Sequence, residues 1–273
     1  MTQQFSLAYL TVANTPPPEM VYMADRVGYD FVSLRPINMG LPGEPDFSLA
    51  KSKSLFRETK QALRDTDIKL LDIELAKIEN GVDPLDYEPE LEVAAELGGR
   101  HVLSSIWTDD RDFYIEQFAK LCDLAAQYEL TIDLEYVPIA SVKNLNEAMD
   151  VLNTVKKDNA GLMLDIHHVH RARDVAEDLK KVPREWFHFL HLCDAPGKIP
   201  SDQEEMLRIV REARSYVGEG GIDVASIVNS VPEVPYSIEL PNKQQIDLLG
   251  YEEFARQCLV KAKEFFAKQY LVK

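Results

Sequence analysis

Two stretches, TIDLEY at residues 131–136 and GLMLDIHH at residues 161–168, show the pattern that decides the fold. Each is a short apolar run that reaches an acidic residue near its end, and a longer amphipathic segment separates the two. Short runs that are apolar on both faces are typical of parallel strands covered by helices. The same alternation predicts strands at residues 5–12, 30–35, 69–75, 101–106, 131–136, 161–165, 187–192 and 236–240.

Helices are predicted between these strands. Apolar residues recur at helical spacing in residues 110–128, and again in the last helix, from Phe254 to Phe266. Prolines at 16–18, and Pro84 after Asp83, are typical of the first turn of a helix. The sequence therefore alternates strand and helix along its whole length.

Eight strands, each followed by a helix, over about 250 residues are typical of a (β/α)8 TIM barrel. We therefore predict an α/β protein with one such barrel, a single domain over residues 1–273. The alternative is a doubly wound open sheet, which usually has a glycine-rich first turn. The segment after Val12 reads Ala-Asn-Thr-Pro-Pro-Pro, so the barrel is favoured.

Composition excludes several classes of protein. The 273 residues carry a formal net charge of −16, with 30 basic and 46 acidic side chains, so nucleic acid and anionic membranes are poor partners. The three cysteines are widely spaced and form no CxxC motif, which indicates a reducing compartment. No apolar run approaches the roughly 18 residues of a membrane span, and the first residues do not resemble a signal peptide. We expect a cytoplasmic protein.

Polar side chains stand at the ends of four successive predicted strands: Glu135, Asp165, His191 and Glu239. In a barrel, residues at consecutive strand ends converge above the axis. Three carboxylates and one imidazole cannot all stay ionised there without a cation. This donor set suits Mn²⁺ or Mg²⁺, with Co²⁺ or Zn²⁺ as alternatives. The competing interpretation is a set of unrelated helix caps and buried pairs. The insertion at 193–221 is long enough to cover the barrel mouth.

The chain resembles the xylose-isomerase-like barrel superfamily, which includes sugar isomerases, ketose 3-epimerases, inosose dehydratases and 3-dehydroshikimate dehydratases. The resemblance covers nearly the whole chain. No single motif is specific, but their order is. The motifs are LEY at Glu135, LDIHH at 164–168, HLCDAP at 191–196, GEGGID at 218–223 and SIEL at Glu239.

The resemblance implies a site and a reaction. Glu135, Asp165, His191 and Glu239 would hold one divalent metal, and His168 would contact a substrate hydroxyl or oxyanion. Glu135 and Glu239 would also be the catalytic acid–base pair on opposite faces of the substrate. We therefore expect a metal-dependent isomerase or epimerase that acts on a sugar or sugar-like polyol through an enediolate.

The alternative function is a metal-dependent dehydratase of a cyclic hydroxy-ketone, of the 3-dehydroshikimate or inosose type. If a β-hydroxyl leaves from the enediolate, the same site eliminates water. Where the epimerases carry an arginine six residues after the metal-binding histidine, this chain has Gly197 beside Lys198. Arg214 ahead of a glycine turn resembles the dehydroshikimate dehydratases, whereas His191 matches the sugar enzymes and inosose dehydratases better.

An arginine at a strand end indicates the charge of the substrate. Arg35, in a chain this acidic, suggests an anionic substrate, although pairing with Glu74 on the next strand is an equal alternative. We predict a small polyol or hydroxy-ketone substrate and leave a homo-oligomer open. The predicted substrate-binding residues are Arg35, Glu74, Trp107, Lys198 and Arg214.

Two further classes of protein agree less well with the sequence. An endonuclease IV-like repair enzyme shares the barrel, but it needs more than six histidines for its three-zinc cluster, and a basic DNA face. A metal-binding protein without catalysis would bind the ion and exchange no substrate proton. His101 and His188 lie away from the predicted mouth and are interpreted as structural.

Overall fold

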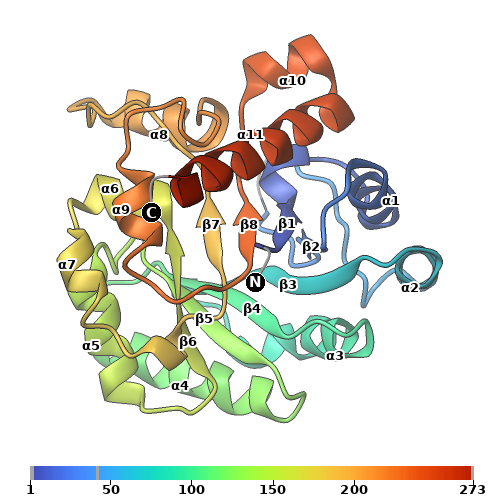
Figure 1. The fold of residues 1–273 in the computed structure, drawn as a ribbon. Coiled ribbons are helices and arrows are strands. Elements are labelled where there is room, and N and C mark those ends of the chain that lie inside the picture. The colour runs from blue at the N-terminus through green and yellow to red at the C-terminus, as the bar shows by residue number, and fades with distance from the viewer. Residues whose placement is uncertain (1–2, 41–42, 272–273) are drawn as a thin grey trace.

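The computed structural model describes residues 3–40 and 43–271, in which eight parallel strands close into a barrel (Figure 1). Each strand is hydrogen-bonded to the next in the sequence, and the last pairs with the first. The predicted (β/α)8 barrel is therefore confirmed, and the open sheet is excluded because β1 has no free edge. The strands are β1 (Phe5–Ala8), β2 (Phe31–Leu34), β3 (Lys69–Ile78), β4 (His101–Ile106), β5 (Thr131–Glu135), β6 (Ala160–Asp165), β7 (Leu190–Leu192) and β8 (Tyr236–Ile238).

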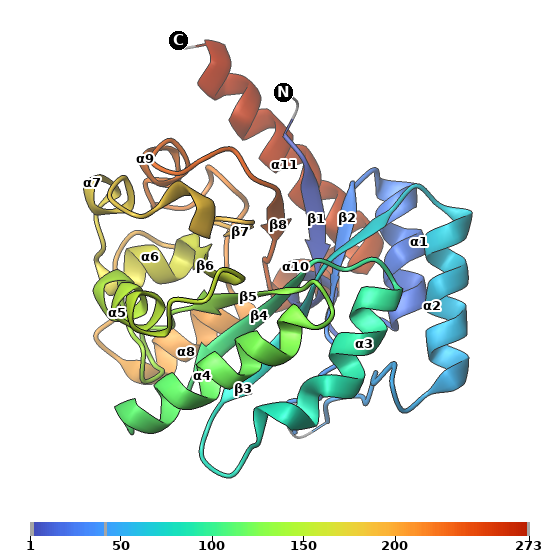
Figure 2. The same cartoon turned by 90° about the horizontal axis from the view of Figure 1, so that it is seen from below.

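Helices surround the barrel and connect its strands (Figure 2). The predicted helix at 110–128 is observed as α4, and Asp110 caps it by accepting a hydrogen bond from the Phe113 N–H at 3.1 Å. The helices are α1 (Pro17–Val27), α2 (Lys53–Asp65), α3 (Glu88–Glu96), α4 (Arg111–Ala126), α5 (Leu145–Val155), α6 (Ile166–Ala172), α7 (Ala176–Leu179), α8 (Gln203–Glu212), α9 (Val224–Val228), α10 (Lys243–Leu249) and α11 (Tyr251–Leu271). Short 3-10 turns are η1 (Tyr9–Val12), η2 (Pro84–Tyr87) and η3 (Arg184–Trp186).

The first strand is shorter than its apolar run predicts. The structure ends β1 at Ala8 and turns Tyr9–Val12 into η1. The Thr11 hydroxyl donates to the Ile238 carbonyl at 2.7 Å and accepts from the Leu240 N–H at 2.8 Å. These side-chain bonds replace ladder bonds to β8, so an apolar sequence continues after the strand has ended.

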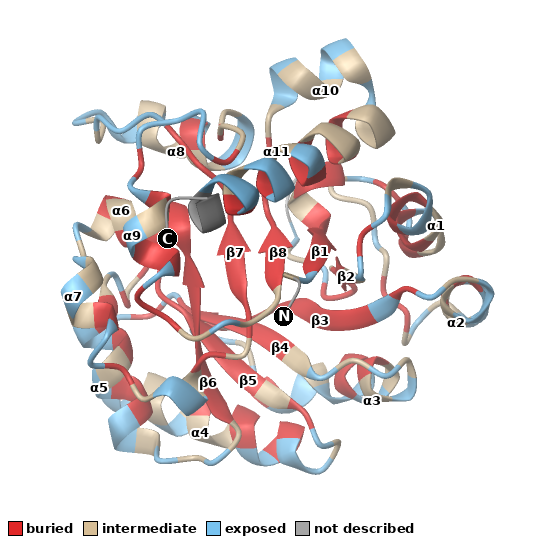
Figure 3. Cartoon of the chain, in the orientation of Figure 1, coloured by how far each residue is buried: buried red, intermediate tan, exposed pale blue. Residues whose placement is uncertain are grey.

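The buried apolar side chains form two clusters, one inside the barrel and one between the barrel and the surrounding helices. The interior cluster is small, and the larger cluster lies between strands and helices. Figure 3 shows buried strands and helices whose outer faces are exposed. The buried members of the interior cluster are Leu71, Leu75, Leu103, Met163 and Phe189.

An irregularity in β3 sets which of its side chains align with β2. The pairing register shifts between Val32 and Ser33, so that Ser33 lies opposite Asp72. One extra residue, Leu71, is thereby accommodated in β3. Asp72 and Glu74 lie in a part of β3 that is buried throughout, and their exposed fractions are 0% and 1%.

The connection after β7 folds over one end of the barrel, the end toward which β7 and β8 point in Figure 1. Asp194 organises it, because its carboxylate accepts hydrogen bonds from four backbone N–H groups. The predicted covering of the mouth by residues 193–221 thus has a buried anionic anchor, 1% exposed. The four donors are Ala195, Gly218, Gly220 and Ile222, at 2.7–3.1 Å.

We expect Asp194→Ala to destabilise the protein by about 3 kcal/mol, because several buried N–H groups would lose an anionic acceptor. The free energy of unfolding from urea denaturation measures this. Asp223→Ala is the matched control, since Asp223 is exposed and accepts only from Ser226 at the start of α9. Its expected cost is about 1 kcal/mol. Equal losses in the two variants would contradict the anchoring role of Asp194.

Candidate metal centre and active site

The four residues predicted to bind metal meet at one end of the barrel. Glu135 and Asp165 are the last residues of β5 and β6, His191 lies within β7, and Glu239 directly follows β8. All four are buried, with exposed fractions between 0% for His191 and 7% for Glu135. Parallel strands place their carboxyl ends on one rim, which is why residues far apart in the sequence converge here.

His191 lies at the centre of the carboxylates. Its Nδ1 is 3.4 Å from Glu239 Oε2, 3.8 Å from Glu135 Oε1 and 4.0 Å from Asp165 Oδ2. Neither ring nitrogen of this buried histidine makes a hydrogen bond to the described residues. A buried imidazole without a partner is costly, so the geometry points to a missing ligand.

Asp165 divides its two oxygens between two tasks. Oδ1 accepts from the His167 N–H at 2.7 Å and so caps α6. Oδ2 faces the site, 3.9 Å from His168 Nε2 and 2.6 Å from Arg214 Nη1. The competing interpretation of Asp165 as a helix cap is therefore correct for Oδ1, whereas Oδ2 faces the site and contacts Arg214.

Arg214 joins the strand ends from the covering loop. Its Nη1 contacts Asp165 Oδ2, Glu239 Oε2 at 3.0 Å and the Glu239 carbonyl at 3.0 Å. The side chain is 2% exposed. In this structure the guanidinium therefore holds the carboxylates of β6 and β8 beside each other.

The charged side chains grouped around His191 do not balance, even when Asp72 is counted as neutral because burial raises its pKa to about 8. The acids outnumber the permanent cations by two, which is the charge of one divalent ion. The histidine nitrogen and carboxylate oxygens, 3.4–4.0 Å apart, also lie within the roughly 4.2 Å that two ligands can span across an ion about 2.1 Å from each. The residues present fit a divalent metal. The acids are Glu74, Glu135, Asp165 and Glu239, and the bases are Arg35 and Arg214.

Protons relieve the excess charge when no metal is bound. Burial raises the pKa of Glu135 well above its ordinary value. Burial lowers the pKa of His191, but the negative charges of Glu239, Glu135 and Asp165 outweigh it and raise that pKa to about 10. Burial also acts to raise the pKa of Glu239, but His191 and Arg214 hold it well below its usual range. One glutamate of the predicted acid–base pair thus favours its acid form and the other its base form.

His168 is positioned differently from His191. It lies one turn into α6, with Nε2 3.7 Å from Glu135 Oε1. Burial lowers its pKa to about 4. A neutral imidazole next to the carboxylates can donate or accept a hydrogen bond, as the predicted contact with a substrate oxygen requires.

A cavity of about 340 Å³ opens above these residues. This volume is near the lower end of the range for small-molecule sites. Arg35 and Glu74 line it and form an ion pair at 3.4 Å, with the Arg35 guanidinium carbon 4.8 Å from the centre of the Tyr9 ring. The pairing that the sequence left as an alternative for Arg35 is therefore present. Among the predicted residues, Arg35, Glu74, Trp107, Glu135, His168, Arg214 and Glu239 line the cavity.

Lys198 is not brought to this cavity: it is exposed on the loop after β7 and does not line it. Arg211, in the last turn of α8, occupies a place on the wall instead. The sequence shows three arginines in this loop, but only the observed helix distinguishes them. Arg208 pairs with Glu205 on the surface, whereas Arg211 and Arg214 reach the cavity.

His101 and His188 lie at the opposite, N-terminal end of the barrel, as expected from their places in the strands. His188 Nδ1 donates to Asp133 Oδ1 at 2.6 Å. Among the described residues, no helix has the length and apolarity needed to cross a membrane.

Comparisons with known proteins agree with this geometry. The sequence is 23% identical over 258 residues to an inosose isomerase of Bacillus velezensis, covering 89% of each chain. The structure of the IolI protein with a bound zinc atom superposes with a TM-score of 0.78 at 20% identity, over 97% of this chain and 99% of that one. A probable 3-DHS dehydratase, AsbF of Bacillus anthracis, gives 0.72 at 15% identity, over 93% and 98%.

The sequence pattern of the xylose isomerase-like TIM barrel family matches residues 21–253, which contain every residue of the site described above except Tyr9. This match covers most of the chain and agrees with the closed barrel and with the convergence of strand-end side chains. The inosose isomerase named above is an enzyme, and so is this protein: the chain belongs to the xylose isomerase-like TIM barrel family.

Proposed function

We propose that the protein is a divalent-metal-dependent isomerase or epimerase of a cyclic polyhydroxy ketone of the inosose class, acting through an enediolate. The observation that carries this proposal is the meeting of three carboxylates with His191, which makes no hydrogen bond to the described residues, at the barrel end where Glu135 and Glu239 line a cavity. The inosose isomerase relatives support the substrate class.

Glu135, Asp165, His191 and Glu239 are the proposed ligands. A divalent cation bound by these four residues would act as a Lewis acid and make a proton next to a carbonyl easier to remove. Because three of the four ligands are carboxylates, we favour Mn²⁺ or Mg²⁺, although the IolI structure contains zinc.

The acid–base work falls to Glu135 and Glu239, which approach the cavity from β5 and β8. The glutamate in its carboxylate form takes the proton beside the carbonyl, and the other returns a proton from the opposite face. Return to the same carbon gives an epimer, and return to the neighbouring carbon gives an isomer. His168 would hold a substrate oxygen, and apolar Val137, Ile139 and Val210 limit access of water.

Arg35, Glu74, Trp107 and Arg214 remain our proposed substrate contacts, with Arg211 added from the structure. Lys198 would need movement of its exposed loop to take part. Arg214 Nη1 is occupied by two carboxylates, so its other nitrogens would have to make the substrate contact. We also place the enzyme in the cytoplasm, in keeping with three free, buried cysteines.

Dehydration of a cyclic hydroxy-ketone is the second candidate function. Besides Arg214, whose Nη1 contacts two carboxylates, Arg35 and Arg211 line the cavity and suit a carboxylate on the substrate, as in 3-dehydroshikimate. The same enediolate would then lose its β-hydroxyl. The fold likeness to the probable 3-DHS dehydratase is compatible with this outcome.

We expect the protein to bind about one equivalent of divalent metal and Glu239→Gln to weaken that binding at least tenfold, because a charged ligand is lost. Elemental analysis after dialysis against Mn²⁺ measures it. Glu252→Gln is the control, since Glu252 is exposed and pairs with Arg26 on the surface. No metal in the wild type under excess Mn²⁺ would overturn the proposed mechanism.

Metal binding should release protons at pH 7. In the metal-free protein the pKa of His191 is raised to about 10, so His191 carries a proton that the metal must displace, and the raised pKa of Glu135 favours its protonated form as well. The affinity should therefore rise as the pH increases from 6 to 9. Titration calorimetry in buffers of different ionisation enthalpy counts the protons. An affinity independent of pH would show that these groups do not bind the ion.

We expect an inosose to exchange its carbon-bound proton with deuterated water and to give an isomeric ketone. Glu135→Gln should lower kcat by about 10²–10⁴, the usual contribution of a general acid–base. Mass and NMR spectra of the product follow both events. A conjugated absorbance developing from 3-dehydroshikimate would instead support the dehydratase. Both functions would be contradicted if the metal-loaded protein neither exchanges the carbon-bound proton of an inosose nor converts 3-dehydroshikimate.

A further inference from the structure

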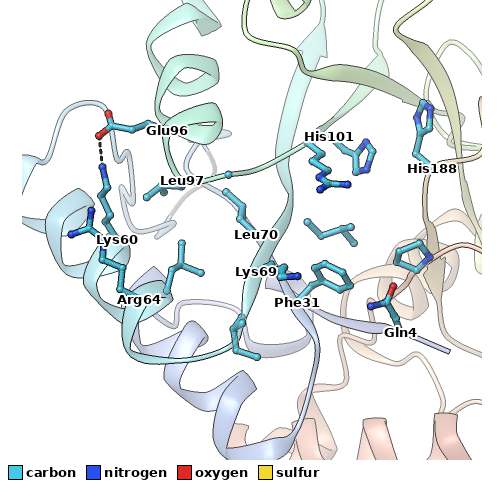
Figure 4. Close-up of a pocket in the computed structure, with 16 residues that line it drawn as sticks. Gln4, Phe31, Lys60, Arg64, Lys69, Leu70, Glu96, Leu97, His101 and His188 are labelled. Carbon is cyan, nitrogen blue, oxygen red and sulfur yellow. Dashed lines mark hydrogen bonds and ion pairs between the residues drawn. The ribbon is translucent and has the colours of Figure 1, made fainter. Parts of the chain in front are cut away.

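A second hollow lies at the opposite end of the barrel and plays no part in the proposed reaction. It has a volume of about 810 Å³ and is formed where several strands begin. In Figure 4, Lys60 and Arg64 of α2 form one side, and His101 and His188 lie on the other. Lys69 begins β3, and Arg100 directly precedes β4.

The charged side chains of this hollow are almost all basic. Lys60 is neutralised by Glu96 at 2.6 Å, which Figure 4 shows as a dashed line. Arg64, Lys69 and Arg100 form no ion pair within the described part of the chain, and Glu96 is the one acid on the lining. In a protein with a net charge of −16, three unneutralised cations around one concavity create a local positive potential.

The two histidines are fixed from below by a buried carboxylate. His188 Nδ1 donates to Asp133 Oδ1 at 2.6 Å, and the Thr131 hydroxyl donates to Asp133 Oδ2 at 2.6 Å. Because that hydroxyl has one proton, it must accept from His101 Nδ1, which lies 2.7 Å away. The rings stack with centres 5.1 Å apart. A side chain at Gly161 would collide with both Asp133 and His188, so a glycine is needed behind the pair.

This arrangement favours an anion over a cation. Asp133, His101 and His188 are close enough to suggest a metal site, but the Asp133 oxygens and both Nδ1 atoms already have hydrogen-bond partners. A metal bound through the Nδ1 atoms would have to break these bonds, and a metal in any position would lie beside three cations. Burial acts to lower the pKa of His188, but the hydrogen bond to Asp133 and its charge outweigh burial and hold that pKa above its ordinary value, which favours the charged form.

Most of the remaining lining is apolar, so the hollow combines basic groups with an apolar surface. Guanidinium and ammonium groups bind phosphate oxygens, whereas an apolar surface gains from covering an organic group. A free inorganic ion would leave this surface exposed to water. The apolar lining residues are Phe31, Leu63, Ile68, Leu70, Leu71, Leu97 and Pro235. Ile68, Leu70 and Leu71 are buried, so the apolar surface open to a ligand belongs to Phe31, Leu63, Leu97 and Pro235.

We propose that this hollow is a binding site for a small organic phosphate, whose phosphate meets Arg64, Lys69 and Arg100 and whose organic part lies on the apolar side around Phe31. The site is separate from the proposed catalytic cavity, because no residue lines both. It requires neither a metal nor the proposed reaction.

Titration calorimetry on the full-length protein tests the proposal with AMP, inorganic phosphate and adenosine as probes. We expect AMP to bind more tightly than phosphate, and adenosine to bind weakly or not at all, because the two parts of AMP act together. Arg64→Gln combined with Arg100→Gln should weaken AMP binding at least tenfold. Both arginines are exposed, so circular dichroism should show an unchanged fold.

Arg57→Gln is the matched control. Arg57 is an exposed arginine of α2 that lies two turns before Arg64 on the same side of the helix, outside the hollow. Its AMP affinity should stay within twofold of wild type. Glu239→Gln should also leave AMP binding unchanged, which excludes binding in the catalytic cavity.

Three outcomes would overturn the proposal. One is no binding of AMP or phosphate at millimolar concentration. Another is equal weakening by the Arg57 and the Arg64 and Arg100 variants, which would indicate non-specific attraction. The third is AMP bound no more tightly than phosphate, which would remove the role of the apolar side.

Discussion

The structure depends on the compensation of buried carboxylates at the carboxyl ends of β5, β6 and β8. Arg214 contributes most visibly, since one nitrogen contacts Asp165 and Glu239 together. This arginine comes from the connection after β7, whose fold rests on the anchor Asp194. The covering loop and the charged centre therefore stabilise each other: loss of the loop would leave two buried anions without their guanidinium.

The two ends of the barrel have opposite electrostatic character. At the carboxyl ends, acidic groups are buried and exceed their permanent cations, which suits a metal ion. At the amino ends, exposed arginines and a lysine surround a hollow with one neutralised acid on its lining. Apolar side chains, among them Leu103, Met163 and Phe189, fill the barrel between the ends. This separation would allow one small fold to present both the proposed metal site and the proposed phosphate site.

Strand-end residues act here in more than one way at once. Asp165 caps α6 with one oxygen and faces the site with the other, and Arg35 pairs with Glu74 while it lines the cavity. From the sequence, such roles look like competing interpretations, because a sequence does not show which atom of a side chain makes which contact. In the structure, the separate atoms of a single group satisfy both roles.

The sequence alone was enough to predict the (β/α)8 barrel and the end of the barrel at which Glu135, Asp165, His191 and Glu239 lie. Strand periodicity and position are local properties, and parallel closure then brings these strand ends together. Only the tertiary structure decided that β1 stops at Ala8, that Arg211 and not Lys198 reaches the cavity, and that Arg64 and Arg100 share a hollow. These facts depend on hydrogen bonds and helix placement between segments remote in the sequence, which no local pattern encodes.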